Sequence, residues 1–356
     1  MQSLPPEIAG KIFEDLTPDS EFKSALPALA LTCRAFLPEA RRALYHSVTL
    51  DTIRHPALHV AELFLRTLHS TPALRPQVHT LAVTIDAHRG RRLGATVAHV
   101  LTLCDALYAL DVDVMRYDDV AERDALHAAI AVRTGLRHLR LATKPVFGKH
   151  RCSAAQSFAL LAALPHLESV QLRTHGWHLD ESAPEAGQVS ACPRLRRISV
   201  DAPLPSAWIP ALTRLAPALA DLDSRSDGLA ALQPAMLQLA LARWAGTLTV
   251  LRLECADAAV VQSILSSLHA VRELRAHASV VAPADFAEYA SLRCLERLEY
   301  GGDEEQLVAL GRVLGQGSLP CLRSVALLRG GQIISRVVAV LNWECRRRGV
   351  TFTIAK

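Results

Sequence analysis

The chain has 356 residues, half of them hydrophobic, and a formal net charge of +4. This supply of apolar side chains suffices for a large core and excludes a disordered chain, and no run of about eighteen apolar residues predicts a membrane span. Arginines and acidic residues are interspersed, so no concentrated basic face predicts nucleic-acid binding. We therefore expect a soluble intracellular protein, cytoplasmic or nuclear, with no nucleic-acid or membrane partner.

The first fifty residues predict three short helices. In the first helix, apolar residues recur every four positions along one face, at Leu4, Ile8, Ile12 and Leu16. The next two helices are expected over residues 25–36 and 38–45, each with its own apolar face. Helices this short cannot bury all their apolar surface on one another, so part of it must contact another domain or another protein.

The residues that carry the resemblance to a known family lie in the same stretch. They are Leu4-Pro5-x-Glu7-Ile8, Ile12-Phe13-x-x-Leu16, Leu31-Thr32-Cys33-Arg34-x-Phe36 and Ala43-Leu44-Tyr45-His46. At these spacings, residues 1–46 resemble an F-box of the form common in mushroom-type fungi. The resemblance implies docking onto a Skp-type adaptor and, through it, onto a cullin ubiquitin ligase. The adaptor-binding residues it implies are Leu4, Pro5, Ile8, Ile12, Phe13 and Leu16. The alternative is that these helices only cap the domain that follows.

Downstream of this segment, one apolar pattern occurs ten times. Each copy has an apolar residue followed by others three and five positions later, as in Val78-Leu81-Val83 and Leu295-Leu298-Tyr300, although some copies are weaker. The copies start at residues 78, 107, 136, 167, 195, 219, 248, 271, 295 and 322. Their mean spacing of about 27 residues is typical of leucine-rich repeats.

Each triplet predicts a short strand, and most are followed by a segment of helical periodicity. We therefore expect an α/β solenoid like that of leucine-rich-repeat proteins, with parallel strands on the concave face and helices outside. The expected domains are a helical head over residues 1–46, a cap or connector over 47–77, and the solenoid with its own C-terminal cap over 78–356. Asn342 is the single asparagine, so the turns must satisfy their backbone groups without the asparagine usual in such repeats.

Polar side chains two and four positions after each triplet start are expected to line the concave face. We predict that this face binds a target protein, through His138, Arg140, Gln171, Arg197, Asp223, Arg252 and Arg275, with Trp177 on a neighbouring loop as an anchor. The alternative is that these alternating charges pair across strands and only keep the face solvated.

No residue pattern predicts catalysis, a metal site or a cofactor. The one local constellation is His175 and His178 followed by Asp180 and Glu181, for which a solvated loop is the simpler interpretation. Eight cysteines occur without a Cys-x-x-Cys pair, and we expect them, including Cys294 and Cys321, to be reduced core residues.

Two functions fit these observations best. The first is a substrate-recognition subunit of a Skp-adaptor and cullin ubiquitin ligase, in which the head binds the adaptor and the repeats bind a target protein. The second is a leucine-rich-repeat interaction scaffold outside the ubiquitin system. An enzyme that uses the loop over residues 175–181 is a third and weaker hypothesis.

Overall fold

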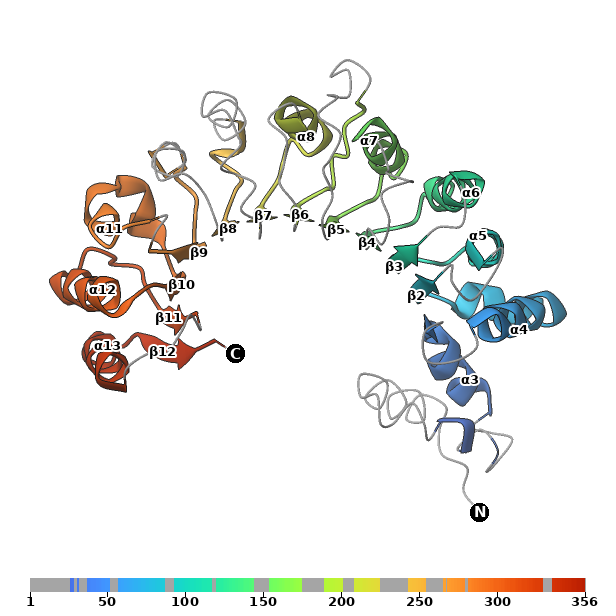
Figure 1. The fold of residues 1–356 in the computed structure, drawn as a ribbon, viewed down its shortest axis with the longest axis horizontal. Coiled ribbons are helices and arrows are strands. Elements are labelled where there is room, and N and C mark those ends of the chain that lie inside the picture. Colours follow the sequence, from blue (N-terminus) through green and yellow to red (C-terminus); the bar gives the residue numbers. More distant parts are fainter. Residues whose placement is uncertain are drawn as a thin grey trace. The chain divides into compact units, whose positions relative to one another are not determined.

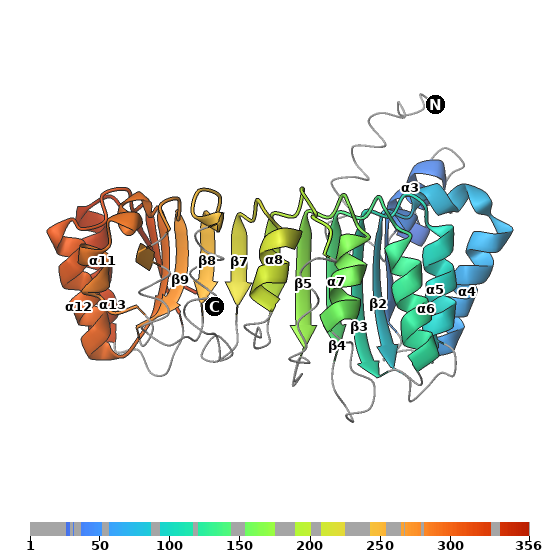
Figure 2. The same ribbon diagram turned by 90° about the horizontal axis from the view of Figure 1, so that it is seen from above.

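The computed structural model contains two compact units, residues 1–150 and 151–356. It describes residues 26–28, 31, 37–51, 57–86, 93–116, 120–143, 154–174, 189–200, 208–224, 243–253, 265–266, 268–278, 281–328 and 335–355. Within each unit, the strands form one layer and the helices lie on one side of it (Figures 1 and 2). Among the described helices, none is long and apolar enough to cross a bilayer. The domain boundaries expected after residues 46 and 77 stay predictions.

The first unit alternates helices with four parallel strands in chain order. Its elements are α3 (Leu37–His46), β1 (Ser47–Asp51), α4 (Ala57–Ser70), the 3-10 helix η1 (Pro72–Gln77), β2 (Thr80–Asp86), α5 (Leu93–Leu103), β3 (Ala109–Arg116), α6 (Val120–Ala131) and β4 (His138–Thr143). β1 pairs with β2, β2 with β3 and β3 with β4, all parallel. The helix α3 confirms the third helix predicted over residues 38–45.

The second unit continues the same alternation over eight parallel strands. Its elements are α7 (Ala154–Ala162), β5 (Ser169–Thr174), β6 (Arg197–Val200), α8 (Ile209–Leu215), β7 (Asp221–Ser224), β8 (Val250–Leu253), β9 (Glu273–His277), α11 (Asp285–Glu288), the 3-10 helix η5 (Ala290–Cys294), β10 (Arg297–Gly301), α12 (Glu304–Gln316), β11 (Ser324–Leu327), α13 (Ser335–Arg347) and β12 (Thr351–Ile354). Each strand pairs with the next one in the chain.

The predicted triplets set the strand positions. The first residue of all ten triplets is buried, and the strand begins two residues after it in every copy. β1 reveals a further copy that the triplet search did not include, because Val48 and Leu50 pair with Leu81 and Val83 of β2. This alternation of α and β elements is the leucine-rich-repeat-like fold expected from the period.

The turns before the strands satisfy their backbone groups without asparagine. In seven of the ten copies the first triplet residue donates its N–H to the carbonyl three residues earlier, as Leu136 does to Arg133 at 3.0 Å, and Leu248 donates to the Trp244 carbonyl four residues earlier at 2.8 Å. Varied side chains bond the carbonyls of the preceding repeat: Trp244 Nε1 donates to the Ala216 carbonyl at 2.8 Å, and Arg348 Nη1 to that of Leu314 at 2.7 Å. The expected absence of an asparagine ladder is thus compensated residue by residue.

Helix ends in the second unit follow the signals in the sequence. α12 starts at a capping box, in which the Asp303 carboxylate accepts from the Gln306 N–H at 2.9 Å and the Gln306 side chain accepts from the Asp303 N–H at 3.0 Å. It ends at Gly317, whose φ of 79° favours glycine. Gly349, with φ of 70°, lies between α13 and β12, which are the last helix and strand of the described chain.

The cysteines do not all lie in the core. Cys104, Cys192 and Cys345 are buried as expected. Cys294 and Cys321 are exposed, so the expectation that they lie in the core was wrong. Cys294 and Cys321 directly precede the buried residues Leu295 and Leu322, and neighbouring positions in such a turn face opposite sides. Burial raises the pKa of the Cys104 thiol to about 12 and that of Cys192 and Cys345 to about 11.

Thiol alkylation should separate these two groups. At a pH of about 8, the buried thiols stay protonated, because their pKa values lie well above it, and the alkylating agent cannot reach them. We expect iodoacetamide to modify Cys294 and Cys321 in the folded chain, and Cys104, Cys192 and Cys345 only after denaturation, as read by peptide mass mapping. Rapid modification of Cys104 in the folded chain would contradict its burial.

Candidate functional site

A polar surface covers the strand layer of the second unit on the side opposite the core. The residues that follow each triplet start by two and by four positions lie on it, and we call these positions two and four of the repeat. The strand register aligns them in two rows. One row runs Arg197, Asp221, Val250, Glu273, Arg297 and Ser324, and the other runs Ser199, Asp223, Arg252, Arg275, Glu299 and Ala326. We call this surface, from β6 to β11, the ladder face.

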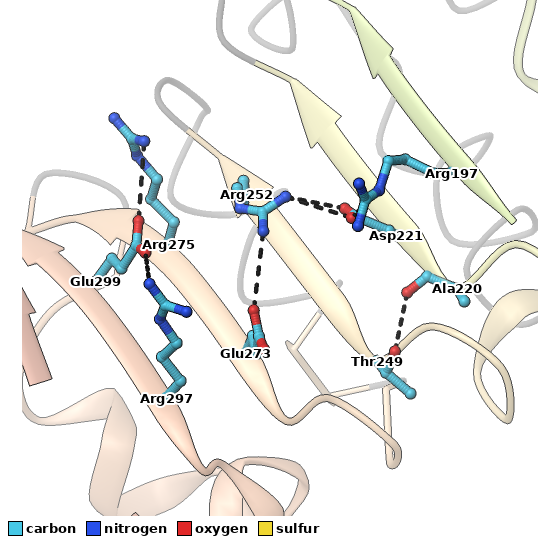
Figure 3. A network of polar contacts seen from close by, with 9 residues as sticks. All are labelled: Arg197, Ala220, Asp221, Thr249, Arg252, Glu273, Arg275, Arg297 and Glu299. Carbon is cyan, nitrogen blue, oxygen red and sulfur yellow. Dashed lines mark hydrogen bonds and ion pairs between the residues drawn. The ribbon is translucent and has the colours of Figure 1, made fainter. Parts of the chain in front are cut away.

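Asp221 is a buried acidic group of the ladder face (Figure 3). Its Oδ2 lies 2.6 Å from Nε of Arg197 on β6, and its Oδ1 lies 3.1 Å from Nη1 of Arg252 on β8. The carboxylate is thus held between two guanidinium groups from the strands on either side. Its side chain is 6% exposed, whereas that of Arg197 is 63% exposed.

Glu299 repeats this arrangement three strands further along. Its Oε1 lies 3.0 Å from Nη2 of Arg297 on the same strand, and its Oε2 lies 3.8 Å from Nη1 of Arg275 on β9. Glu273 lies between the two groups and contacts Arg252 at 3.8 Å. Arginines and carboxylates are therefore interspersed across the ladder face from β6 to β10.

Glu296 forms a third group at the edge where the strands start. Its Oε1 lies 3.4 Å from Nη1 of Arg272, and its Oε2 lies 3.8 Å from Nε of Arg323. These three residues directly precede β10, β9 and β11 in turn. The side chains of Arg272 and Arg323 are 65% and 79% exposed, against 31% for Glu296.

The three groups have the same arrangement, and we call them the arginine triads. In each, one carboxylate has its two oxygens next to two different arginines. The arginines are the more exposed members, so the surface offers guanidinium N–H donors while the carboxylates lie beneath. In the first unit, Arg133 and Asp105 show the opposite order, at 14% and 82% exposed. The outward arginines are therefore a feature of this surface and not of every ion pair in the chain.

The structure places most of the residues predicted to bind a target. Arg197, Arg252 and Arg275 belong to the triads, Asp223 is buried and accepts from the Ser199 hydroxyl at 3.3 Å, and Gln171 is half-buried on β5. In the first unit, Arg140 pairs with Asp111 at 2.6 Å. The alternative that opposite charges pair across strands is thus confirmed for the four arginines. Whether they also bind a target stays a prediction.

His138 belongs to a different neighbourhood in the first unit. Its exposed ring meets the ring of Tyr108 edge-on, with centroids 6.3 Å apart, and Tyr108 in turn lies beside His79 and His46. The rings of His46 and His79 stack at 4.7 Å. The strand starts of this unit are therefore lined by rings, whereas in the second unit Arg196, Arg272 and Arg323 directly precede β6, β9 and β11.

Sequence reasoning missed the triad around Glu296. The rows read from the sequence used positions two and four of each repeat, whereas Arg272, Glu296 and Arg323 all occupy position one. In a regular strand, position one would share the face of the buried position three. Here the chain has not yet entered the strand, and the side chain is free to face solvent. Reading position one as a third row would have found the triad.

Several predicted residues lie outside the described part of the chain. They are the adaptor-binding set Leu4, Pro5, Ile8, Ile12, Phe13 and Leu16, the anchor Trp177, and the histidines and carboxylates at positions 175, 178, 180 and 181. Among the residues that are described, no cluster of three or more His, Cys, Asp or Glu side chains could hold a metal ion.

The structure is similar to that of the leucine-rich repeat-containing protein LegL7 from Legionella pneumophila. The two share 17% sequence identity and a TM-score of 0.48, over 87% of this chain and 94% of that one. No protein-family model and no curated protein matches the sequence. The fold assignment rests on the repeats and strand register of this chain itself.

The Asp221 triad can be tested by stability. Asp221→Asn removes the charge that two arginines share in a buried position, and we expect it to lower the free energy of unfolding by about 1–3 kcal/mol, less than for a fully buried pair because Arg197 is mostly in solvent. Glu273→Gln is the control, since this half-exposed group makes a 3.8 Å contact, and should cost less than about 0.5 kcal/mol. Urea denaturation measures both, and equal effects would contradict the special role of Asp221.

Proposed function

We propose that this chain is a protein-interaction scaffold that binds a partner protein on the ladder face of its second unit. The observation that carries this proposal is the set of arginine triads, which hold charged side chains at fixed spacing on a rigid parallel sheet. Such rows of polar groups on stacked repeats are how solenoids present a binding surface. The chain itself would perform no chemistry.

Preorganisation supports this proposal. A free arginine side chain loses rotamer freedom when it binds, at a cost of about 0.5–1.5 kcal/mol. Here Arg197 and Arg297 are already held by Asp221 and Glu299, so part of that cost is met when the chain folds. The sheet beneath is equally fixed, because Leu251, Leu274 and Leu298 are at most 1% exposed.

Site-specific photo-crosslinking tests which face binds. A benzophenone amino acid at Val250, in the middle of the ladder face, should form an adduct with one partner protein that unlabelled chain competes away. The control is the same amino acid at Val340, an exposed valine on α13 on the helix side. Adducts from Val340 and none from Val250 would place binding on the helices and refute the proposal.

We further propose a more specific role, as the substrate receptor of a Skp-adaptor and cullin ubiquitin ligase. The resemblance of residues 1–46 to an F-box supports it, and so does the helix α3, which begins where the third helix of such a head is expected. In this role the head would bind the adaptor while the ladder face binds the target, and the chain would act in the cytoplasm or the nucleus.

The head can be tested without knowing the target. Ile8→Asp together with Ile12→Asp places charges on the apolar face predicted to bind the adaptor, where each large side chain would contribute about 1.5–3 kcal/mol. We expect the double variant, like a chain lacking residues 1–46, to lose co-purification with a Skp-type adaptor. Val132→Asp is the control at an exposed apolar position and should retain it. Retention by the double variant would leave only the capping role for the head.

A further inference from the structure

We infer that the segment of the partner that contacts the ladder face is acidic, and that it binds through the outward arginines of the triads. This inference rests on the proposed scaffold function and specifies the chemistry of its partner. Its docking residues are Arg197 and Arg297 on the ladder face and Arg272 and Arg323 at the edge where the strands start.

The first argument is which atoms the surface offers. Each guanidinium carries five N–H donors in a planar fork that fits a carboxylate. All four docking arginines have side chains more than half exposed even though each contacts a carboxylate. A carboxylate from a partner can therefore reach donors that the internal ion pair leaves in solvent, with the charge-assisted geometry that gives the stronger class of hydrogen bond.

The second argument is the state of the acidic groups. Each triad carboxylate has both oxygens next to an arginine, and none of the three side chains is more than 31% exposed. At each triad, an incoming carboxylate therefore meets guanidinium before it meets the negative charge beneath. Arginines also outnumber carboxylates over the ladder face and its edge. The six arginines of the triads face five carboxylates, which are Asp221, Glu296 and Glu299 of the triads together with Glu273 and Asp223.

The third argument separates an acidic polypeptide from a nucleic acid. Single-stranded nucleic acid is usually held by aromatic rings on which the bases stack. At positions two and four of the described strands β5 to β12, no side chain is Phe, Tyr or Trp. The half-exposed Glu273 would also repel a continuous phosphate backbone, whereas a polypeptide can place its acidic side chains only where the arginines are.

The length of the surface sets the probe. Five strand spacings of about 4.8 Å separate β6 from β11, which is roughly 24 Å. An extended peptide covers that distance with about eight residues. A fluorescein-labelled oligoglutamate of about eight residues is therefore the matched ligand, with an oligoglutamine of the same length as the uncharged control and an oligothymidylate as the nucleic-acid control.

Fluorescence anisotropy on the full chain tests the inference. We expect the oligoglutamate to bind at least about tenfold more tightly than oligoglutamine. Its affinity should fall as salt is raised from about 50 to 200 mM, because exposed charges are screened. The double substitution Arg272→Gln with Arg323→Gln should weaken the binding of oligoglutamate by about tenfold. The matched control, Arg312→Gln with Arg336→Gln, removes the same charge from exposed positions on α12 and α13 and should weaken it less than about twofold.

A second double variant, which keeps both positive charges, tests whether a loss of binding comes from misfolding. Arg272→Lys with Arg323→Lys keeps the charge but loses the planar fork, so its affinity should fall between those of the wild type and the glutamine pair. The inference is overturned if oligoglutamate does not bind, if both glutamine pairs weaken it equally, or if oligothymidylate binds more tightly. In each of these cases a specific adduct at Val250 would still support the scaffold, and its absence would remove both proposals.

Discussion

The packing of both units depends on one constraint, which is that neighbouring parallel strands pair in a constant register through their buried triplet residues. Leu81, Leu110 and Leu139 lie side by side in the first unit, and Leu274, Leu298 and Val325 do so in the second. A single repeat buries too little apolar surface to be stable, so each one relies on its neighbours. A slip of one residue would turn this row to solvent.

The same register creates the polar surface on the other side of the sheet. Because alternate side chains point to opposite faces, fixing the buried leucines also fixes where the residues between them project. Arg197 is thereby placed directly opposite Asp221, and Glu299 opposite Arg275. Apart from those of the buried Asp221, the ion pairs of the triads are partly exposed and contribute only about 0–1 kcal/mol each, so they matter more for the chemistry that the surface offers than for stability.

The two proposed binding regions would use different kinds of interaction. The apolar face from Leu4 to Leu16 would bind by burying hydrophobic surface, which salt does not screen, whereas the arginine triads would bind through charge. A receptor that joins an adaptor to a target needs two such regions that do not compete. The scaffold role needs only the ladder face and does not depend on what the head binds.

The sequence by itself determined the repeat period, the strand positions and the buried residues, because the apolar pattern is local and each repeat states it again. It also determined which residues line the strand face, since alternation along a strand follows from backbone geometry. It did not decide which charges pair. Asp221 contacts both Arg197, which lies directly opposite, and Arg252, which lies diagonally across, and only the placement of the strands side by side determines these contacts. Nor did it decide that Cys294 and Cys321 are exposed or that Glu296 lies between Arg272 and Arg323, because these residues lie in the turns before the strands, where the strand pattern does not give the direction of a side chain. Those outcomes belong to the tertiary structure, in which residues about 27 positions apart become neighbours.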